Sequence, residues 1–154
     1  MATRSKLLDV NVLSIFLVEN HPGNVYVDPV VSEGLAGTYR LLVPDYLPLR
    51  ARWVLTTRWG IAKTDADRAI QDFLEQRRVR YVGATRATLR SAYELAHRLR
   101  HDVYDTFYLA LARDHGASAL VTTDTGFREL CRRVGIEYEN PVPSDVLSRF
   151  GAAG

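Results

Sequence analysis

Short apolar runs alternate with longer helical patterns along the whole chain, and this alternation constrains the fold more than any other feature. The predicted strands are residues 6–10, 39–44, 79–84, 118–123 and 136–139. The predicted helices are residues 11–20, 25–36, 45–59, 64–78, 85–100, 102–114, 124–134 and 144–150. Strands that alternate with helices pair in parallel, with the helices covering both faces of the sheet. The sequence therefore predicts an α/β fold, a three-layer α/β/α domain with a central, mainly parallel sheet.

Turn and capping residues mark the boundaries of these elements. Pro44 ends the second strand and Gly60 closes the helix that follows it. Thr64 and Asp67, three residues apart, are typical of a capping box at the start of the next helix. The chain has no internal repeat and no linker rich in glycine, serine and proline, so we expect residues 1–154 to form a single domain.

Composition excludes several classes of protein. Cys131 is the only cysteine, so an internal disulfide is impossible and a core position in its helix is expected. No apolar run approaches the roughly 18–20 residues of a membrane span, and the N-terminus lacks a signal-peptide pattern. The net charge of +2 does not demand a polyanionic partner. We therefore expect a soluble protein of the reducing cytoplasm, without a membrane partner.

Arginine supplies almost all of the positive charge, since lysine occurs only as Lys6 and Lys63. Arginine favours bidentate contacts with carboxylate and phosphate, although a compositional bias of the lineage explains the same count. Residues 45–59 also interleave tryptophan and tyrosine with arginine. This pattern fits stacked bases and bound phosphates, or equally a packed core with a dimer interface.

Three aspartates fall where a parallel sheet places its ligands, at the carboxyl ends of the strands. Asp9 ends the first predicted strand, and Asp124 follows the fourth in "LVTTD". Asp105 begins the helix at 102–114, which is apolar on nearly every face past its first turn. A carboxylate is rarely buried in such a helix unless it is paired or bound to a metal. We therefore expect the three side chains to converge at one edge of the sheet.

A divalent cation would relieve the repulsion among three converging carboxylates. Ligands that are all oxygen favour hard ions such as Mg²⁺ or Mn²⁺, which polarise a phosphodiester and lower the pKa of a bound water. The pattern indicates metal-dependent phosphodiester hydrolysis. Each aspartate also has a simpler explanation as a helix cap or a first-turn residue, with Asp102 as the actual cap ahead of Asp105.

Three motifs resemble those of PIN-domain proteins. "LLDVNVLSIFL" is similar to the family's opening "DTNVLL", "VYDTFYLALA" to its Ala-rich helix headed by Asp, and "LVTTDTGF" to its "LvTxDxxF" motif. The resemblance covers essentially the whole chain and implies a Rossmann-like fold with Mg²⁺- or Mn²⁺-dependent ribonuclease activity. It also implies a VapC-type toxin with an RNA substrate, a homodimer paired with an antitoxin protein.

Carried over by motif, the resemblance implies catalytic and metal-binding roles for Asp9, Asp105 and Asp124. It implies that Asn11 supports Asp9 by hydrogen bonding. It also implies that Thr123, which precedes Asp124, lies near the site.

The chain departs from the family at a fourth acidic residue, a glutamate early in the helix after the second strand. Arg50 falls near that position, and no glutamate occurs from Gly34 to Gln71. Asp45 is the acidic candidate nearby, either as a fourth metal ligand or only as a helix N-cap. Arg50 and Arg52 are candidate contacts for the substrate phosphate. The alternative function is a non-catalytic PIN-like domain that binds RNA or protein with an incomplete acidic cluster.

Overall fold

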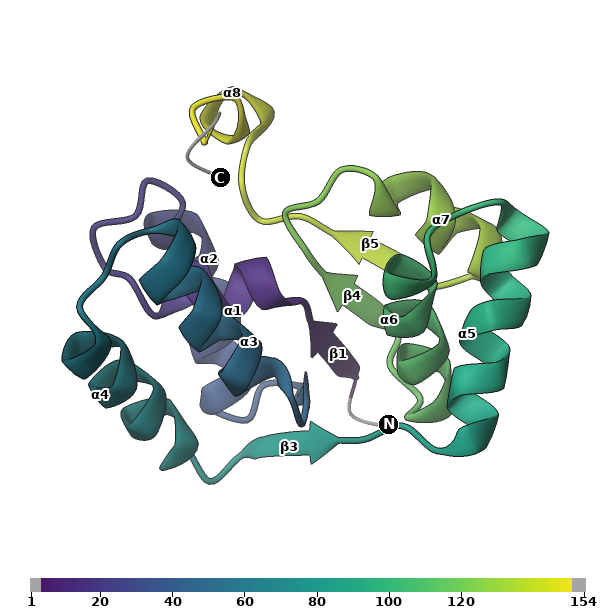
Figure 1. Cartoon of the computed structure of the whole chain (residues 1–154), viewed down its shortest axis with the longest axis horizontal. Helices are drawn as coiled ribbons and strands as arrows, with labels where there is room; N and C mark the ends of the chain where they lie inside the picture. The colour runs from purple at the N-terminus through teal and green to yellow at the C-terminus, as the bar shows by residue number, and fades with distance from the viewer. Residues whose placement is uncertain (1–3, 151–154) are drawn as a thin grey trace.

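The computed structural model describes residues 4–150, and its elements follow the predicted alternation of strands and helices (Figure 1). The strands are β1 (Ser5–Leu8), β2 (Arg40–Pro44), β3 (Val79–Val82), β4 (Ala119–Val121) and β5 (Glu137–Glu139). The helices are α1 (Val10–Phe16), α2 (Asn24–Leu35), α3 (Leu47–Trp53), α4 (Lys63–Leu74), α5 (Arg86–Leu99), α6 (Val103–Asp114), α7 (Phe127–Val134) and α8 (Ser144–Leu147). A π-helical segment, η1 (Val54–Arg58), continues α3 directly.

The five strands form one parallel sheet in the order β3-β2-β1-β4-β5. β1 lies at the centre, where Leu7 pairs in register with Leu42 of β2 and Leu120 of β4. Helices cover both faces of the sheet, which explains why the central strands are apolar runs rather than alternating patterns. The predicted three-layer α/β/α fold with a parallel sheet is confirmed.

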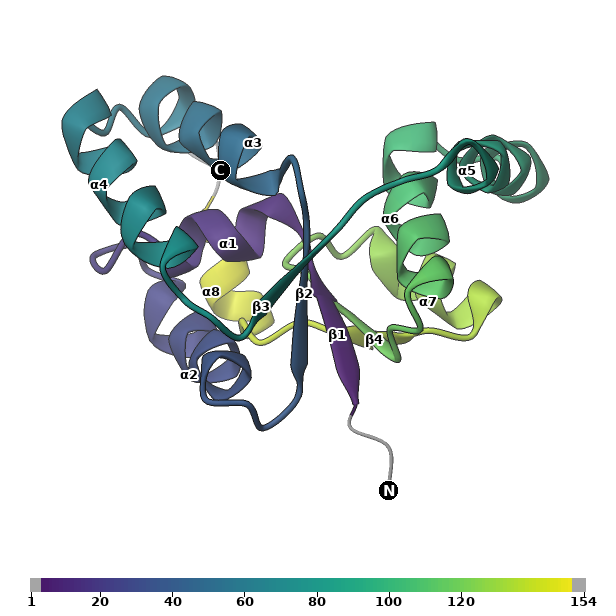
Figure 2. The ribbon, with the colours of Figure 1, turned by 90° about the horizontal axis from the view of Figure 1, so that it is seen from below.

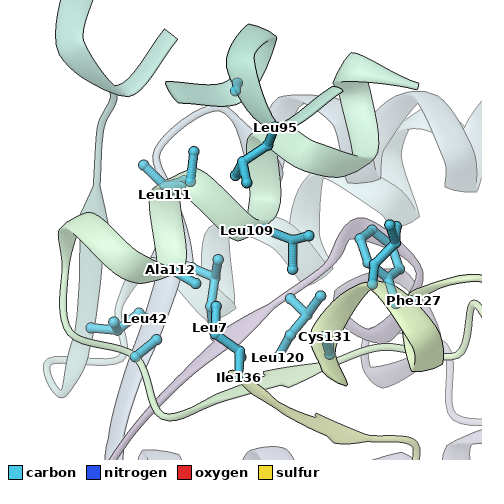
Figure 3. Packing of buried hydrophobic residues seen from close by; sticks show 14 of the residues in the cluster. Leu7, Leu42, Leu95, Leu109, Leu111, Ala112, Leu120, Phe127, Cys131 and Ile136 are labelled. Carbon is cyan, nitrogen blue, oxygen red and sulfur yellow. The ribbon is translucent and has the colours of Figure 1, made fainter. Parts of the chain in front are cut away.

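The two helical layers are separated by the sheet when the molecule is viewed from below (Figure 2). α5, α6 and α7 pack on one face around Leu7, Leu120 and the buried Cys131, and Figure 3 shows this cluster. α1, α2 and α3 pack on the other face around Leu8 and Val121. Neighbouring residues of one strand thus serve opposite layers, as the pleat of a strand requires.

The predicted capping box at the start of α4 is wrong. The N-cap is Ala62, which makes no side-chain cap bond, so Thr64 lies inside the first turn. Asp67 instead accepts a hydrogen bond from Arg52 Nε at 2.6 Å, because a charged partner on α3 competes for its carboxylate. The described part of the chain contains no helix that is both long and apolar enough to cross a bilayer.

Candidate active site

Asp9 lies at the carboxyl end of β1 and is buried. Its Oδ1 accepts a hydrogen bond from the backbone N–H of Val12 at 2.9 Å, which makes Asp9 the N-cap of α1. Its Oδ2 accepts a hydrogen bond from the hydroxyl of Thr122, which follows β4. The capping role therefore fixes this carboxylate at the junction of two neighbouring strands, and capping does not compete with a role in a site.

Burial, together with the nearby charge of Asp124, raises the pKa of the Asp9 carboxyl to about 6. Hydrogen bonds from Thr122, from the Val12 amide and from the backbone of Asn11 act in the opposite direction. Asn11 thus supports Asp9 through its main chain. A buried carboxylate of this kind is costly to ionise, and a neighbouring cation is what would relieve that cost.

The resemblance predicted that Thr123 lies near the site, whereas Thr122 is the threonine that contacts Asp9. Its buried hydroxyl donates to Asp9 and accepts a hydrogen bond from the backbone N–H of Asp124 at 3.0 Å. Thr123 is partly exposed. The motif "LvTxDxxF" contained the signal, because its threonine stands two residues before the aspartate, which is the position of Thr122 here.

Asp124 is exposed and starts the turn that leads into α7. Its Oδ1 accepts a hydrogen bond from the Gly126 amide at 2.9 Å within that turn. The N-cap of α7 is Gly126, which has no side-chain cap bond, so the alternative of Asp124 as the helix cap is wrong. The charge of Asp124 also raises the pKa of both Asp9 and Asp105. Asp124 is therefore the electrostatic link between the other two aspartates.

Asp105 lies in the first turn of α6, where Asp102 is the N-cap and accepts a hydrogen bond from the Tyr104 amide at 2.8 Å. Partial burial raises the pKa of Asp105, and the charge of Asp124 adds to this, whereas His101 lowers it. The partner that the structure gives this carboxylate is His101, whose Nδ1 lies 3.3 Å from Oδ2.

Asp9, Asp124 and Asp105 are called the acidic row here, because each end aspartate is coupled by charge to the middle one. Within residues 4–150, no group of three His, Cys, Asp or Glu side chains is close enough to hold one ion as it stands. The donor set is nevertheless all oxygen, which suits Mg²⁺ or Mn²⁺. Joint binding would require the exposed Asp124 and half-buried Asp105 side chains to turn toward the fixed Asp9.

Asp45 is exposed at the carboxyl end of β2 and lies against the end of β3. A Cβ added at Gly83 would lie 2.8 Å from its Oδ2. The N-cap of α3 is Tyr46, without a side-chain cap bond, so the alternative of Asp45 as the N-cap is wrong. Burial raises the pKa of Tyr46, and the charges of Asp45 and Asp9 add to this effect.

The two candidate arginines serve different surfaces. Arg52 is committed to its ion pair with Asp67 and thereby joins α3 to α4. The Arg50 guanidinium carbon lies 4.4 Å from the ring centroid of Trp53, and Arg50 lines a groove beside the start of α1. Arg50 is therefore the better placed of the two to meet a substrate.

This groove has a volume of about 870 Å³ and is lined by residues of α3, α5 and α6 and by Val10. It is strongly aromatic, and its lining includes Tyr46, Tyr93, Tyr104, Phe107 and Tyr108. The apolar pattern of α6 predicted that Tyr108 packs in the core, and gave no sign that it lines a groove.

The domain has a parallel sheet between two helical layers, with aspartates at the carboxyl ends of its central strands. This arrangement is typical of Rossmann-like folds, which bind ligands at that edge of the sheet. The family model of the PIN domain matches residues 6–133, and the chain belongs to this family. No curated protein is similar enough in sequence to match the chain.

Two solved structures share the fold. A chain in the crystal structure of VapBC2 from Rickettsia felis, bound to a DNA fragment from their promoter, has a TM-score of 0.66 and 13% identity, covering 88% of this chain and 98% of that chain. VapC20 from Mycobacterium tuberculosis, a Sarcin-Ricin loop cleaving toxin, has a TM-score of 0.65 and 16% identity, covering 81% of this chain and 94% of that chain. At these identities the likeness establishes a common architecture.

Proposed function

We propose that this chain is a Mg²⁺- or Mn²⁺-dependent endoribonuclease and the toxin of a VapBC-type toxin–antitoxin pair. The observation that carries the proposal is the acidic row, with buried Asp9 coupled to Asp124 and Asp124 coupled to Asp105, in a PIN domain. The description of VapC20 as a Sarcin-Ricin loop cleaving toxin supports RNA as the substrate. The VapBC2 structure supports an antitoxin protein as the partner.

In this proposal the three aspartates of the row hold the cation, and Asp45 is an additional candidate ligand. When bound there, a divalent cation would polarise the phosphodiester and would lower the pKa of a water molecule. Thr122 and the Val12 amide keep the Asp9 carboxylate oriented through their two hydrogen bonds. To hold the cation, Asp105 would have to exchange its contact with His101 for one with the ion. Arg50 offers its guanidinium to the substrate phosphate.

We further propose that the protein acts as a homodimer in the cytoplasm. Four large apolar side chains are exposed on α3 and α5, the two helices that flank the groove: Leu49, Trp53, Leu89 and Tyr93. Aromatic residues are enriched in protein–protein interfaces, whose buried cores are apolar.

Thermal unfolding with and without Mn²⁺ tests the metal-binding part of this proposal. Millimolar Mn²⁺ should raise the melting temperature relative to protein in EDTA, because a ligand that binds only the native state stabilises it. Asp124→Asn should abolish most of this shift, since asparagine preserves the turn to Gly126 but removes the charge. Asp102→Asn is the matched control, because asparagine caps a helix as well as aspartate. Equal melting temperatures with Mn²⁺ and with EDTA would contradict metal binding.

The second candidate function is a PIN-like domain that binds RNA without cleaving it. It is favoured by Arg50 near the position of the family's glutamate, and by the acidic row not closing around one point within residues 4–150. This candidate predicts RNA binding that is equal in EDTA and in Mn²⁺, with no cleavage in either. The nuclease proposal predicts cleavage in Mn²⁺ alone.

A further inference from the structure

Basic side chains gather at the corner where α5 ends and α6 begins, and the two arginines among them have no role in the proposal above. An open hollow of about 760 Å³ lies at this corner, called the α5–α6 corner here. The hollow is lined by Ala96, His97, Arg98, Arg100, His101 and Asp102. It therefore presents two guanidinium groups and two imidazole rings against a single carboxylate.

The α5–α6 corner is in direct contact with the acidic row. His101 lines the hollow, and its Nδ1 lies 3.3 Å from Asp105 Oδ2. The first turn of α6 divides the corner from the aromatic groove, since Asp102 lines the hollow whereas Val103 and Tyr104 line the groove. An RNA strand with a phosphodiester at Asp105 must place its neighbouring phosphates on the surfaces that adjoin this turn.

The arginines of the corner have no partner inside the protein. Arg98 and Arg100 are exposed, and among residues 4–150 neither side chain has an ion pair or a hydrogen bond. The carboxylate in the hollow, Asp102, is committed to the helix cap through its bond from the Tyr104 amide at 2.8 Å. The guanidinium donors are thus available to an external anion, and arginine binds phosphate through paired N–H groups.

The backbone of Arg100 indicates that its side chain serves a contact outside the chain. Its φ of 53° lies in the left-handed region, and among residues 4–150 it is the one residue other than glycine with a positive φ. Helices usually end in this way on glycine, as α7 does at Gly135 with a φ of 77°. The Arg100 and His101 amides both donate to the Ala96 carbonyl, and a glycine amide would do the same. The local structure therefore favours glycine, and the arginine side chain makes no contact that compensates for it.

We propose that Arg98 and Arg100 bind backbone phosphates of the RNA beside the acidic row, on the α5–α6 side of Asp105. The inference rests on the proposed RNA substrate and adds a defined subsite to it. An acidic segment of a partner protein would also bring anions. RNA is the better match, because a strand held at the acidic row reaches the corner directly through the contact between His101 and Asp105.

The test is the affinity of the full chain for a fluorescent single-stranded RNA of mixed sequence, measured in EDTA at several salt concentrations. The double variant Arg98→Gln with Arg100→Gly should weaken binding about tenfold at low salt. The plot of log affinity against log salt concentration should also become shallower, by about 0.7 for each phosphate charge that is no longer neutralised. Arg100→Lys should keep the slope of the wild type, because it retains the charge.

The matched control is Arg86→Gln with Arg90→Gln, which removes the same charge from exposed positions in the first half of α5. This control should keep the affinity and the salt slope of the wild type. The test variant should be no less stable than the wild type in urea, because glycine suits the left-handed backbone and glutamine suits an exposed helix. Arg98→Gln alone decides the matter if the double variant does not fold.

Equal losses of RNA affinity in the two double variants would overturn the inference, because they would show only a general effect of charge. Unchanged affinity in the test variant would overturn it too. Polyglutamate is the second probe, and binding of polyglutamate that depends on the two arginines as strongly as RNA binding does would favour an acidic protein segment instead.

Cleavage in Mn²⁺ separates this inference from the nuclease proposal. A wild type that cleaves RNA while the test variant binds RNA normally refutes the subsite alone. A wild type that binds RNA through Arg98 and Arg100 but never cleaves refutes the nuclease alone, and one without RNA affinity refutes both.

Discussion

At the scale of single residues, burial makes the ionised form of Asp9 unfavourable in the metal-free folded protein. Its pKa is about 6 in the folded chain, against 3.8 for the free side chain. A difference of about 2 pKa units corresponds to roughly 3 kcal/mol. Because the folded state holds this proton more tightly than the unfolded state, protonation of Asp9 stabilises the fold. This stabilisation is fully present below pH 3.8 and is lost as the pH rises through about 6.

Asp9→Asn should therefore stabilise the protein in EDTA at pH 7 to 8, by about 1–3 kcal/mol. Asparagine accepts from the Val12 amide and still pairs with the Thr122 hydroxyl, but it cannot ionise. Urea unfolding at pH 4.5, 6 and 7.5 measures the gain, which should shrink toward low pH. Asp72→Asn, an exposed position on α4, should show no such trend. A gain for Asp9→Asn that grows toward low pH would contradict the assignment.

The variant Asp45→Ser tests whether Asp45 takes part in metal binding. Because Asp45 makes no cap bond in α3, stability should change by less than about 0.5 kcal/mol. If Asp45 is the fourth acidic residue, the Mn²⁺ concentration needed for half of the thermal shift should rise. A Mn²⁺ titration that matches the wild type would contradict the role of Asp45 as the fourth acidic residue and would leave a site of three aspartates.

The residues of the acidic row were predictable because strand ends and helix starts are visible in the sequence. Their contacts were not. Either Thr122 or Thr123 can point inward, depending on the register at the end of β4. A shift of one residue exchanges the two side chains, because successive side chains of a strand point to opposite faces. The pairing of Asp105 with His101 depends on the path of the chain between α5 and α6, which no local pattern encodes.

At the scale of elements, α5 and α6 form the wall of the groove, and their mutual position depends on how α5 begins. Thr85 accepts from the Thr88 amide at 3.3 Å, and the Thr88 hydroxyl accepts from the Thr85 amide at 3.0 Å, a reciprocal capping box. The Thr88 hydroxyl also donates to Asp114 at the end of α6. This cap therefore joins the start of one helix to the end of the other.

Thr85→Ala should lower the free energy of unfolding by about 1 kcal/mol, the usual value of a lost N-cap. Chemical denaturation in urea measures the change. Thr57→Ala removes a comparable hydroxyl from an exposed position in η1 and should be nearly neutral. Equal stabilities of Thr85→Ala and Thr57→Ala would show that the capping box contributes little.

At the scale of the whole molecule, the order of strands and helices followed from the alternation in the sequence. The short apolar runs indicated strands, and the longer patterns between them indicated helices. The start of α4 did not, because its Asp67 pairs with Arg52 on another helix. The groove was also beyond sequence reasoning, since it is built from α3, α5 and α6 together. Local patterns specify elements, whereas a site shared by distant elements depends on their packing.

The exposed apolar side chains on α3 and α5 provide the test of the proposed homodimer. Leu89→Glu should convert a dimer into a monomer in sedimentation equilibrium, because a buried unpaired charge at an interface is costly. Leu74→Glu on α4 is a matched control, since both leucines are 49% exposed. A wild type that sediments as a monomer, or a Leu89→Glu variant that remains a dimer, would contradict this surface.

The central claim is that the acidic row of this PIN domain cleaves RNA with a divalent cation. The most direct measurement is cleavage of single-stranded RNA by wild type, Asp105→Asn and Asp102→Asn in Mn²⁺, with EDTA as the blank. Wild type and Asp102→Asn should cleave in Mn²⁺ alone. Asp105→Asn should be slower by about a hundredfold or more, because the site loses a charge that helps to hold the cation. Cleavage by Asp105→Asn at the wild-type rate, or no cleavage by the wild type, would contradict the account.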